Sequence, residues 1–390
     1  MMEHKPNYAS SHETRTISAK RFEISPYDKH FATPETVWGV YAQRFYPLTS
    51  GEDATEHYWK LRRSALLFDV PEKPIKIIGP DAIPYLEHLF TRKISDLKDW
   101  RARYAIACNP DGGILMDGVL MRLAKDHFIY VQADGEFMPW MAAQATGFDV
   151  RVSDPKSWVL QVQGPKALDI LAQAAENIPG KFGYFHVAKA YFAGQELLTS
   201  RTGWTGEMGF EIYGRPDIDA DALWHHLLDK GKEFDLTFCS LETMGIRRME
   251  AGILDNGTDM DPNMTPFQAG LGVFVDLSKG NFVGKKALAE ANTDCRLFGL
   301  KCQDAIPFAG LDVYNRTDHV AKMRAGAWSP YLDTGIGYVH FNKAGNWLGR
   351  ELTLKARDGS NQSCKIVSLP FYDEEKLIPR GKPHRFSPDS

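Results

Sequence analysis

A Gly-rich turn between two apolar segments, Asn109-Pro110-Asp111-Gly112-Gly113, constrains how this chain can fold. Proline presets one backbone angle of a turn, and glycine accepts the positive φ that a tight turn requires. The segments on either side are therefore expected to pair as two antiparallel strands. Tyr104 precedes the turn and Asp117 follows it, so the hairpin folds one of these residues back towards the other.

Asp117 interrupts the apolar face of the second expected strand. Because side chains alternate along a strand, Leu115, Asp117, Val119 and Met121 share one face. An unpaired carboxylate among apolar neighbours is costly. Two interpretations remain open. Either this face is exposed or Asp117 pairs with an arginine elsewhere, or the carboxylate contacts a bound ligand.

Composition restricts the class of partner. The chain has 390 residues, of which 43% are hydrophobic, so it can bury sizeable cores in two or three domains. A formal net charge of −4 without a dense Lys/Arg segment argues against nucleic acid or an acidic membrane surface as the main partner. No apolar stretch reaches the roughly 18 residues of a membrane span. We expect a soluble cytoplasmic protein whose partners are small molecules.

The spacing of cysteines, histidines and glycines indicates no familiar metal or nucleotide site. The 5 cysteines are scattered, and the 12 histidines lack the spacing of metal ligands. We therefore expect no metal and no disulfide framework. The Gly-rich corner at 279–286 lacks the spacing of a phosphate-binding loop, and no Gly-x-Gly-x-x-Gly occurs, so it is interpreted as an ordinary corner.

Two segments of the chain resemble each other. Residues 75–82 read Ile-Lys-Ile-Ile-Gly-Pro-Asp-Ala, and residues 160–167 read Leu-Gln-Val-Gln-Gly-Pro-Lys-Ala. Each predicts a strand, a Gly-Pro corner and a helix with apolar residues at helical spacing. The pattern suggests two similar units side by side.

We expect four regions along the chain. Residues 1–50 form an N-terminal extension, and residues 51–295 hold the two similar α+β units. Residues 296–375 alternate as strands do and form a small β domain, and residues 376–390 form a loose tail. The segment 22–59 is rich in aromatic residues, for which core packing is the favoured interpretation and a cation–π cage the alternative.

Ordered motifs from about Glu56 to Tyr372 resemble the folate-binding aminomethyltransferase family, to which the glycine-cleavage T-protein belongs. Each motif alone is common, but their shared order over most of the chain is specific. The motifs are Leu66-Leu-Phe-Asp-Val, Ile78-Gly-Pro-Asp-Ala, Tyr104 with Asn109 and Gly113-Ile-Leu-Met-Asp117, Val162-Gln-Gly-Pro, Arg201-Thr-Gly-Trp-Thr-Gly-Glu-Met-Gly-Phe-Glu211-Ile, Arg248-Met-Glu-Ala-Gly, Asp259-Met-Asp with Thr265-Pro, Lys279 to Gly284, and Ser329-Pro330.

The resemblance implies an α+β, three-domain T-protein-like fold around a central opening that binds tetrahydrofolate, with a small C-terminal β-barrel. Asp117 then lies near the folate nitrogens that accept the one-carbon unit, and it is the expected catalytic residue. Tyr104 matches a tyrosine that borders the folate, and Glu211 matches a glutamate that accepts hydrogen bonds from the amino edge of the pterin. Arg248 and Tyr372 match weaker contacts along the folate; alternatively, Arg248 only pairs with a neighbouring glutamate or a backbone carbonyl.

The sequence departs from the family pattern where the one-carbon donor is expected. Met116 replaces the first of two successive acids, Pro71-Glu-Lys replaces Ser-His-Met, and Thr243-Met-Gly replaces Ala-Arg-Asp. We therefore expect a tetrahydrofolate-dependent methyltransferase, that is, a demethylase. It would move a methyl group from a small S-, N- or O-methyl compound to N5 of tetrahydrofolate and give 5-methyltetrahydrofolate.

Other functions on the same fold remain open. An aminomethyltransferase of the glycine-cleavage type would release 5,10-methylenetetrahydrofolate and ammonia, and it would require a lipoyl carrier protein. A non-catalytic iron–sulfur maintenance factor carries a cysteine where this chain has Asn281. A folate domain of a flavin-linked amine dehydrogenase would need a separate flavin-binding partner. The sequence does not fix the oligomeric state.

Overall fold

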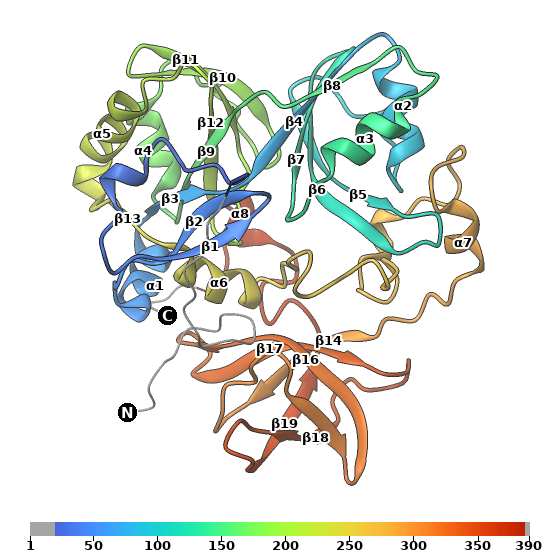
Figure 1. Ribbon diagram of the computed structural model, residues 1–390. Coiled ribbons are helices and arrows are strands. Elements are labelled where there is room, and N and C mark those ends of the chain that lie inside the picture. The colour runs from blue at the N-terminus through green and yellow to red at the C-terminus, as the bar shows by residue number, and fades with distance from the viewer. Residues whose placement is uncertain (1–19, 387–390) are drawn as a thin grey trace.

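The computed structural model describes residues 20–386 and contains two sheets side by side above a closed barrel (Figure 1). Residues 1–19 of the expected N-terminal extension and residues 387–390 of the expected tail lie outside the described residues. The α+β class and the C-terminal β-barrel are confirmed. Among the described residues, no helix has the length and apolar character needed to cross a membrane.

The first sheet has the strand order β10-β11-β12-β9-β3-β13 and is antiparallel except for the β3–β13 pair. Its core forms where apolar residues of two helices, such as Ile170 and Leu227, pack against strand residues such as Val162. The elements are β3 (Leu66–Val70), β9 (Trp158–Gln163), α4 (Ala167–Ala174), β10 (Val187–Phe192), β11 (Gln195–Ser200), β12 (Gly209–Gly214), α5 (Ala220–Gly231), the 3₁₀ helix η2 (Lys232–Phe234) and β13 (Thr237–Phe238).

The second sheet has the order β5-β6-β7-β4-β8 and is antiparallel. Helices α2 and α3 cover one face, where Tyr85, Leu89 and Met141 contribute to the core. The elements are β4 (Lys73–Ile78), α2 (Ala82–Leu89), β5 (Arg101–Cys108), β6 (Ile114–Ala124), β7 (His127–Gln132), α3 (Met138–Gln144) and β8 (Arg151–Ser153).

The expected hairpin joins β5 and β6. The side chain of Asn109 closes the turn, because its Oδ1 accepts hydrogen bonds from the backbone N–H groups of Asp111 (3.0 Å) and Gly113 (2.9 Å). Asp117 pairs with Ile106 and Tyr104 pairs with Val119 in the antiparallel register. The turn therefore sets the register that brings Tyr104 and Asp117 together.

The two Gly-Pro corners begin α2 and α4 at corresponding places in the two units. Gly79 has a φ of +154° and Gly164 a φ of +132°, values that side chains disfavour. The backbone also approaches closely, because a Cβ atom added at Gly164 would lie 2.3 Å from the carbonyl oxygen of Ser64. Only glycine fits such a corner.

We expect Gly164→Ala to lower the free energy of unfolding by at least about 2 kcal/mol, since it adds both backbone strain and a collision. Gly180→Ala is the matched control: an added Cβ at Gly180 would have no heavy atom of the described residues within 4 Å, and Gly180 has no positive φ. Urea unfolding measures both variants. Equal stability of the two would contradict the argument.

The remaining elements surround the junction of the sheets and the barrel. Helices α1 and α6 contact each other, and α6 also contacts strands of the barrel and β2. The elements are η1 (Asp28–His30), β1 (Val37–Tyr41), β2 (Arg44–Thr49), α1 (Ala54–Arg63), α6 (Leu241–Glu250), η3 (Gly272–Phe274), α7 (Lys285–Glu290), the barrel strands β14 (Leu297–Cys302), β15 (Asp312–Asn315), β16 (Asp318–Ser329), β17 (Thr334–Phe341), β18 (Glu351–Lys355) and β19 (Asn361–Val367), and α8 (Leu377–Arg380).

The aromatic residues of the segment 22–59 occupy two different environments. Tyr27 and Phe31 are buried in the core of the first sheet, as the packing interpretation predicts. Tyr41 and Tyr46, on the hairpin β1–β2, instead line a cavity. Arg44 fixes this hairpin: its guanidinium lies 3.9 Å above the Trp158 ring and donates to the carbonyl oxygen of Glu72 at 2.7 Å.

The C-terminal segment up to residue 386 packs against the body instead of hanging loose. Pro379 of α8 accepts a hydrogen bond from Arg201 at 2.9 Å, and the carbonyl oxygen of Phe386 accepts one from Arg62 at 2.6 Å. Both donors lie far away in the sequence, Arg62 by 324 residues and Arg201 by 178 residues. The amino-acid composition of the C-terminal segment could therefore not predict these contacts.

Candidate active site

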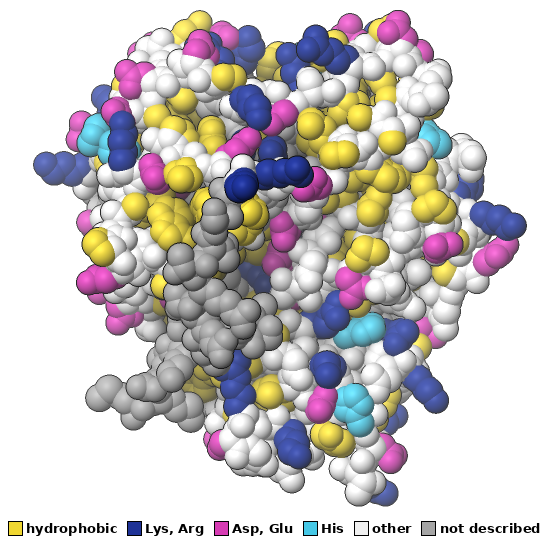
Figure 2. Space-filling view, in the orientation of Figure 1, with side chains coloured by type: hydrophobic (Ala, Val, Ile, Leu, Met, Phe, Trp, Pro, Cys, Tyr) yellow, Lys and Arg dark blue, Asp and Glu magenta, His cyan; other side chains and the backbone are white. Residues whose placement is uncertain are grey.

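A cavity of about 340 Å³ lies between the hairpin β1–β2, the end of β3, α6 and the barrel. On the face drawn in Figure 2, acidic side chains lie near the middle of the molecule, where the sheets approach the barrel. The cavity wall is contributed by distant parts of the chain, including Tyr46 of β2, Arg248 of α6 and Arg324 of β16. Bringing these residues together requires the complete fold.

Asp117 is buried, with 6% of its surface exposed, and both of its oxygens have donors. The hydroxyl of Tyr104 donates to Oδ2 at 2.9 Å, and the amide of Asn256 donates to Oδ1 at 3.2 Å. No arginine among residues 20–386 forms an ion pair with it, so within the described part of the chain neither exposure nor an arginine explains this carboxyl group. Burial raises the pKa of Asp117 to about 6, against the lowering effect of the hydrogen bonds from Tyr104 and Asn256.

Glu211, on β12, is buried beside a second glutamate. Thr202 donates to its Oε2 at 2.7 Å, and Gln161 donates to its Oε1 at 2.9 Å. The same Gln161 amide lies 3.3 Å from Oε1 of Glu72, which lines the cavity. Burial and the charge of Glu211 raise the pKa of Glu72 well above its ordinary value. Oε2 of Glu72 and Oε1 of Gln161 are buried without a hydrogen-bond partner among the described residues.

Arg248 lies on α6 at the cavity wall. It is paired with Asp259 and donates to the carbonyl oxygen of Ile253 at 3.1 Å. Its guanidinium also lies 5.1 Å from the ring of Trp204. Arg248 therefore bonds to a backbone carbonyl, as one of the two interpretations from the sequence predicted. It also lines the cavity, so the other interpretation, a contact with folate, stays a prediction.

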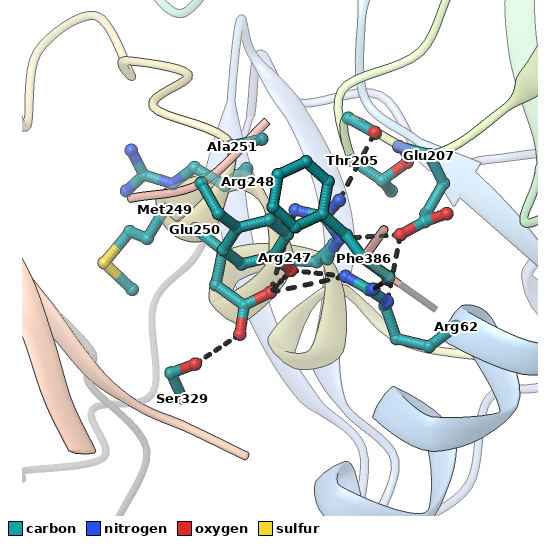
Figure 3. A network of polar contacts seen from close by, with 12 residues as sticks. Arg62, Thr205, Glu207, Arg247, Arg248, Met249, Glu250, Ala251, Ser329 and Phe386 are labelled. Atoms are coloured by element: carbon teal, nitrogen blue, oxygen red, sulfur yellow. Dashed lines mark hydrogen bonds and ion pairs between the residues drawn. The ribbon is translucent and has the colours of Figure 1, made fainter. Parts of the chain in front are cut away.

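Tyr372 lies on the far side of α6, outside the cavity wall. Its hydroxyl donates to Oε2 of Glu250 at 2.6 Å and accepts a hydrogen bond from Arg62. Figure 3 shows the same network, in which Glu207 contacts Arg62 and Arg247. The structure therefore brings Tyr104 to Asp117, but it does not bring Tyr372 to them.

The sequence did not single out Asn256 and Asp255, which follow α6. Asn256 holds Asp117, as described above, and Asp255 lines the cavity. Oδ2 of Asp255 accepts a hydrogen bond from Thr258 at 3.0 Å, whereas Oδ1 is buried without a partner among residues 20–386. Asp255-Asn-Gly-Thr has the composition of an ordinary turn. No local signal could have identified either residue.

Comparisons with known proteins identify relatives of this chain over both sheets and the barrel. Residues 27–279 match the GCVT N-terminal domain, and residues 296–373 match the glycine cleavage T-protein C-terminal barrel domain. An aminomethyltransferase from Caldanaerobacter subterraneus subsp. tengcongensis is 31% identical over 332 residues, which cover 82% of this chain and 88% of that protein. One from Streptomyces coelicolor is 33% identical over 344 residues, covering 85% and 92%.

A solved structure supports the same relationship. The crystal structure of the glycine cleavage system aminomethyltransferase T from Bartonella henselae matches with a TM-score of 0.81 at 28% identity, covering 90% of this chain and 98% of that chain. These findings define the class as a tetrahydrofolate-dependent one-carbon transferase, which confirms the expected enzyme class and cofactor. The chain belongs to the aminomethyltransferase (glycine cleavage T-protein) family.

The expectation of a demethylase acting on a small methyl compound was wrong. The relatives, at 31% to 33% identity, are named aminomethyltransferases, and the matching structure is a glycine cleavage T-protein. The departure at Met116 was over-interpreted, since Met116 is buried in the core of the second sheet, on the face of β6 opposite to Asp117. Thr243 donates to the carbonyl oxygen of Ala54 at 3.3 Å. Other residues of the departures do line the cavity: Pro71, Glu72, Met244 and Gly245.

Proposed function

We propose that this protein is an aminomethyltransferase of the glycine-cleavage type. It takes the aminomethyl group from a lipoyl-bearing carrier protein and transfers its carbon to tetrahydrofolate. The products are 5,10-methylenetetrahydrofolate, ammonia and the carrier with a free dihydrolipoyl thiol. The observation that carries the proposal is the match to an aminomethyltransferase T over 98% of that chain, at a TM-score of 0.81. Both family domains are therefore present in one chain.

The buried acceptors near Glu211 fit the pterin ring of tetrahydrofolate. The amino edge of that ring presents N–H donors, and a carboxylate or amide oxygen accepts them. Glu211, Oε2 of Glu72 and Oε1 of Gln161 supply such acceptors, and the last two have no partner among the described residues. Unpaired buried polar atoms are costly, so a donor-rich ligand edge would stabilise them.

Asp117 is the proposed catalytic residue. When bound, tetrahydrofolate supplies the nucleophilic nitrogen that accepts the one-carbon unit. The Asp117 carboxylate stabilises the positive charge that develops there and can take up a proton, because its pKa of about 6 is near neutrality. Tyr104 and Asn256 hold this carboxyl group in one orientation.

The other expected site residues have different proposed tasks. Tyr104 borders the folate and orients Asp117, and Arg248 contacts the folate from the cavity wall. Tyr372 is proposed to act indirectly, because its hydroxyl is already engaged by Glu250 and Arg62. It supports α6, and through α6 the position of Arg248.

The cytoplasm is the proposed compartment. All five cysteines are free, and Cys108, Cys239, Cys302 and Cys364 are buried. Free thiols in this number are typical of reducing compartments.

An assay of ammonia release tests the proposal. The purified protein is mixed with tetrahydrofolate and an aminomethylated lipoyl carrier protein. Ammonia should appear in an amount equal to the carrier consumed, and its release should require tetrahydrofolate. The same carrier without an aminomethyl group is the control. No tetrahydrofolate-dependent release with a loaded carrier would refute the function.

The pH dependence of kcat/KM provides a further prediction. Because the charged form of Asp117 is required, kcat/KM should rise as the pH increases through about 6. Tyr104→Phe removes a hydrogen bond that lowers the pKa of Asp117. The rise of kcat/KM, which forms the acidic limb of the pH profile, should therefore move to higher pH. Tyr130→Phe is the control, since the Tyr130 hydroxyl donates to the carbonyl oxygen of Ala105 at 3.1 Å and not to Asp117. An unmoved limb in Tyr104→Phe would argue against this role.

A further inference from the structure

The charges of four carboxyl groups act on the phenol of Tyr41. Burial raises the pKa of Tyr41 well above its ordinary value, and the charges of Asp255, Glu72, Asp117 and Asp134 raise it further. Asp255 also raises the pKa of Tyr46, after the larger effect of burial. The hairpin β1–β2 thus places two tyrosines against an acidic part of the cavity wall.

Among these four carboxyl groups, Asp255 is the one best placed to bind a cation. Both oxygens of Asp117 already accept hydrogen bonds from the protein. Asp134 is not among the cavity-lining residues, and its Oδ1 accepts hydrogen bonds from two backbone N–H groups. Glu72 shares a buried site with Glu211, and burial together with the charge of Glu211 raises the pKa of Glu72 well above its ordinary value, which disfavours its charged form. Unlike Asp117 and Asp134, Asp255 lines the cavity, and its Oδ1 has no partner among the described residues.

The surroundings of Asp255 suit a small ammonium group. Tyr41, Tyr46 and Trp204 line the same cavity, and aromatic faces attract cations. Two arginines also line the cavity, Arg248 and Arg324, and each is paired with an aspartate other than Asp255. Burial and the charge of Asp259 raise the pKa of Asp255 to about 7, against the lowering effect of Arg248. A bound cation would therefore readily draw Asp255 into its charged form.

We propose that Asp255 binds the protonated amino group of the aminomethyl donor. This inference rests on the proposed function, in which the donor is an S–CH₂–NH₃⁺ group on the lipoyl arm. One N–H of that group donates to Oδ1 of Asp255, while Thr258 keeps its hydrogen bond to Oδ2. Asp255 then sets the choice of donor, and Asp117 serves the acceptor nitrogen. The aminomethyl carbon forms bonds to the two folate nitrogens as its bonds to sulfur and nitrogen break. The two folate N–H protons leave with the dihydrolipoyl thiol and with the ammonia, which is released beside Asp255.

Binding to two matched carriers tests this assignment. One carrier bears an S-aminomethyl lipoyl group, and the other bears an S-ethyl group of the same size without charge. Asp255→Asn should weaken binding of the aminomethyl carrier about tenfold, the value of one lost charge-assisted hydrogen bond. Binding of the S-ethyl carrier and of tetrahydrofolate should change little. Asp255→Ser, which also lacks the charge, should behave in the same way.

Glu242→Gln is the matched control. Glu242 is another acidic residue of the cavity wall, and burial raises its pKa to about 7, as for Asp255. The charges that act on Glu242 are those of Glu52 and Asp53, so Glu242 is not part of the acidic cluster that acts on Tyr41. This variant should keep the preference of the wild-type protein for the aminomethyl carrier.

The possible failures can be told apart. If both Asp255 variants retain the preference for the aminomethyl carrier, or lose affinity equally for both carriers, the assignment of Asp255 is overturned. The proposed function then still stands, provided that the wild-type protein releases ammonia from the aminomethyl carrier. If the wild-type protein binds the carrier but releases no ammonia with tetrahydrofolate, the proposed function itself fails.

Discussion

Asp117→Asn should lower kcat by about 10²-fold to 10⁴-fold while leaving the Kd for tetrahydrofolate nearly unchanged. Asparagine keeps the shape of the side chain and can still bond to Tyr104, but it carries no charge and cannot accept a proton. The interaction that is lost is one that matters in the transition state more than in the ground state. Single-turnover kinetics and equilibrium binding of tetrahydrofolate separate the two quantities.

Asp111→Asn is the control for this experiment. Asp111 lies in the turn of the same hairpin, and it is exposed. Its substitution should change neither kcat nor folate binding. If Asp117→Asn retains normal turnover, or loses folate binding in proportion to turnover, then Asp117 is not the catalytic residue.

Glu250→Gln should lower the free energy of unfolding by about 3 kcal/mol. Glu250 is fully buried on α6 and accepts hydrogen bonds from Tyr58, at 2.8 and 2.9 Å, and from Ser329 of the barrel. Two buried arginines, Arg62 and Arg247, are balanced by Glu250 and Glu207. Removing one negative charge leaves a buried positive charge without compensation (Figure 3).

The shift of the urea unfolding midpoint measures this effect. Glu290→Gln, which changes an exposed glutamate at the end of α7, should alter the free energy of unfolding by less than about 0.5 kcal/mol. An equally small change for Glu250→Gln would show that the network does not hold α1, α6 and the barrel together.

The parts of the fold that depend on local chemistry could be predicted from the sequence. Asn109 and the glycines at 112 and 113 identify a hairpin. The hairpin brings Tyr104 and Asp117 onto neighbouring strands, where the Tyr104 hydroxyl donates a hydrogen bond to Asp117. The two Gly-Pro corners likewise follow from backbone sterics at Gly79 and Gly164. In each case the determinants lie within a few residues of one another.

The rest of the site depends on contacts between distant residues. Asn256 reaches Asp117 from 139 residues away, and nothing near Asn256 in the sequence marks it as a partner. Tyr41 reaches the cavity because the anchoring of Arg44 fixes a short hairpin, which aromatic composition alone does not reveal. Met116 misled the choice of donor for the same reason, since the sequence does not show that its side chain packs into a core.

The mass of the folate product tests the central claim most directly. The protein is mixed, in a single turnover, with tetrahydrofolate and a carrier whose aminomethyl carbon is labelled with ¹³C. The account predicts labelled 5,10-methylenetetrahydrofolate in an amount equal to the ammonia released. Unchanged tetrahydrofolate with a loaded carrier, or labelled 5-methyltetrahydrofolate as the first product, would contradict it.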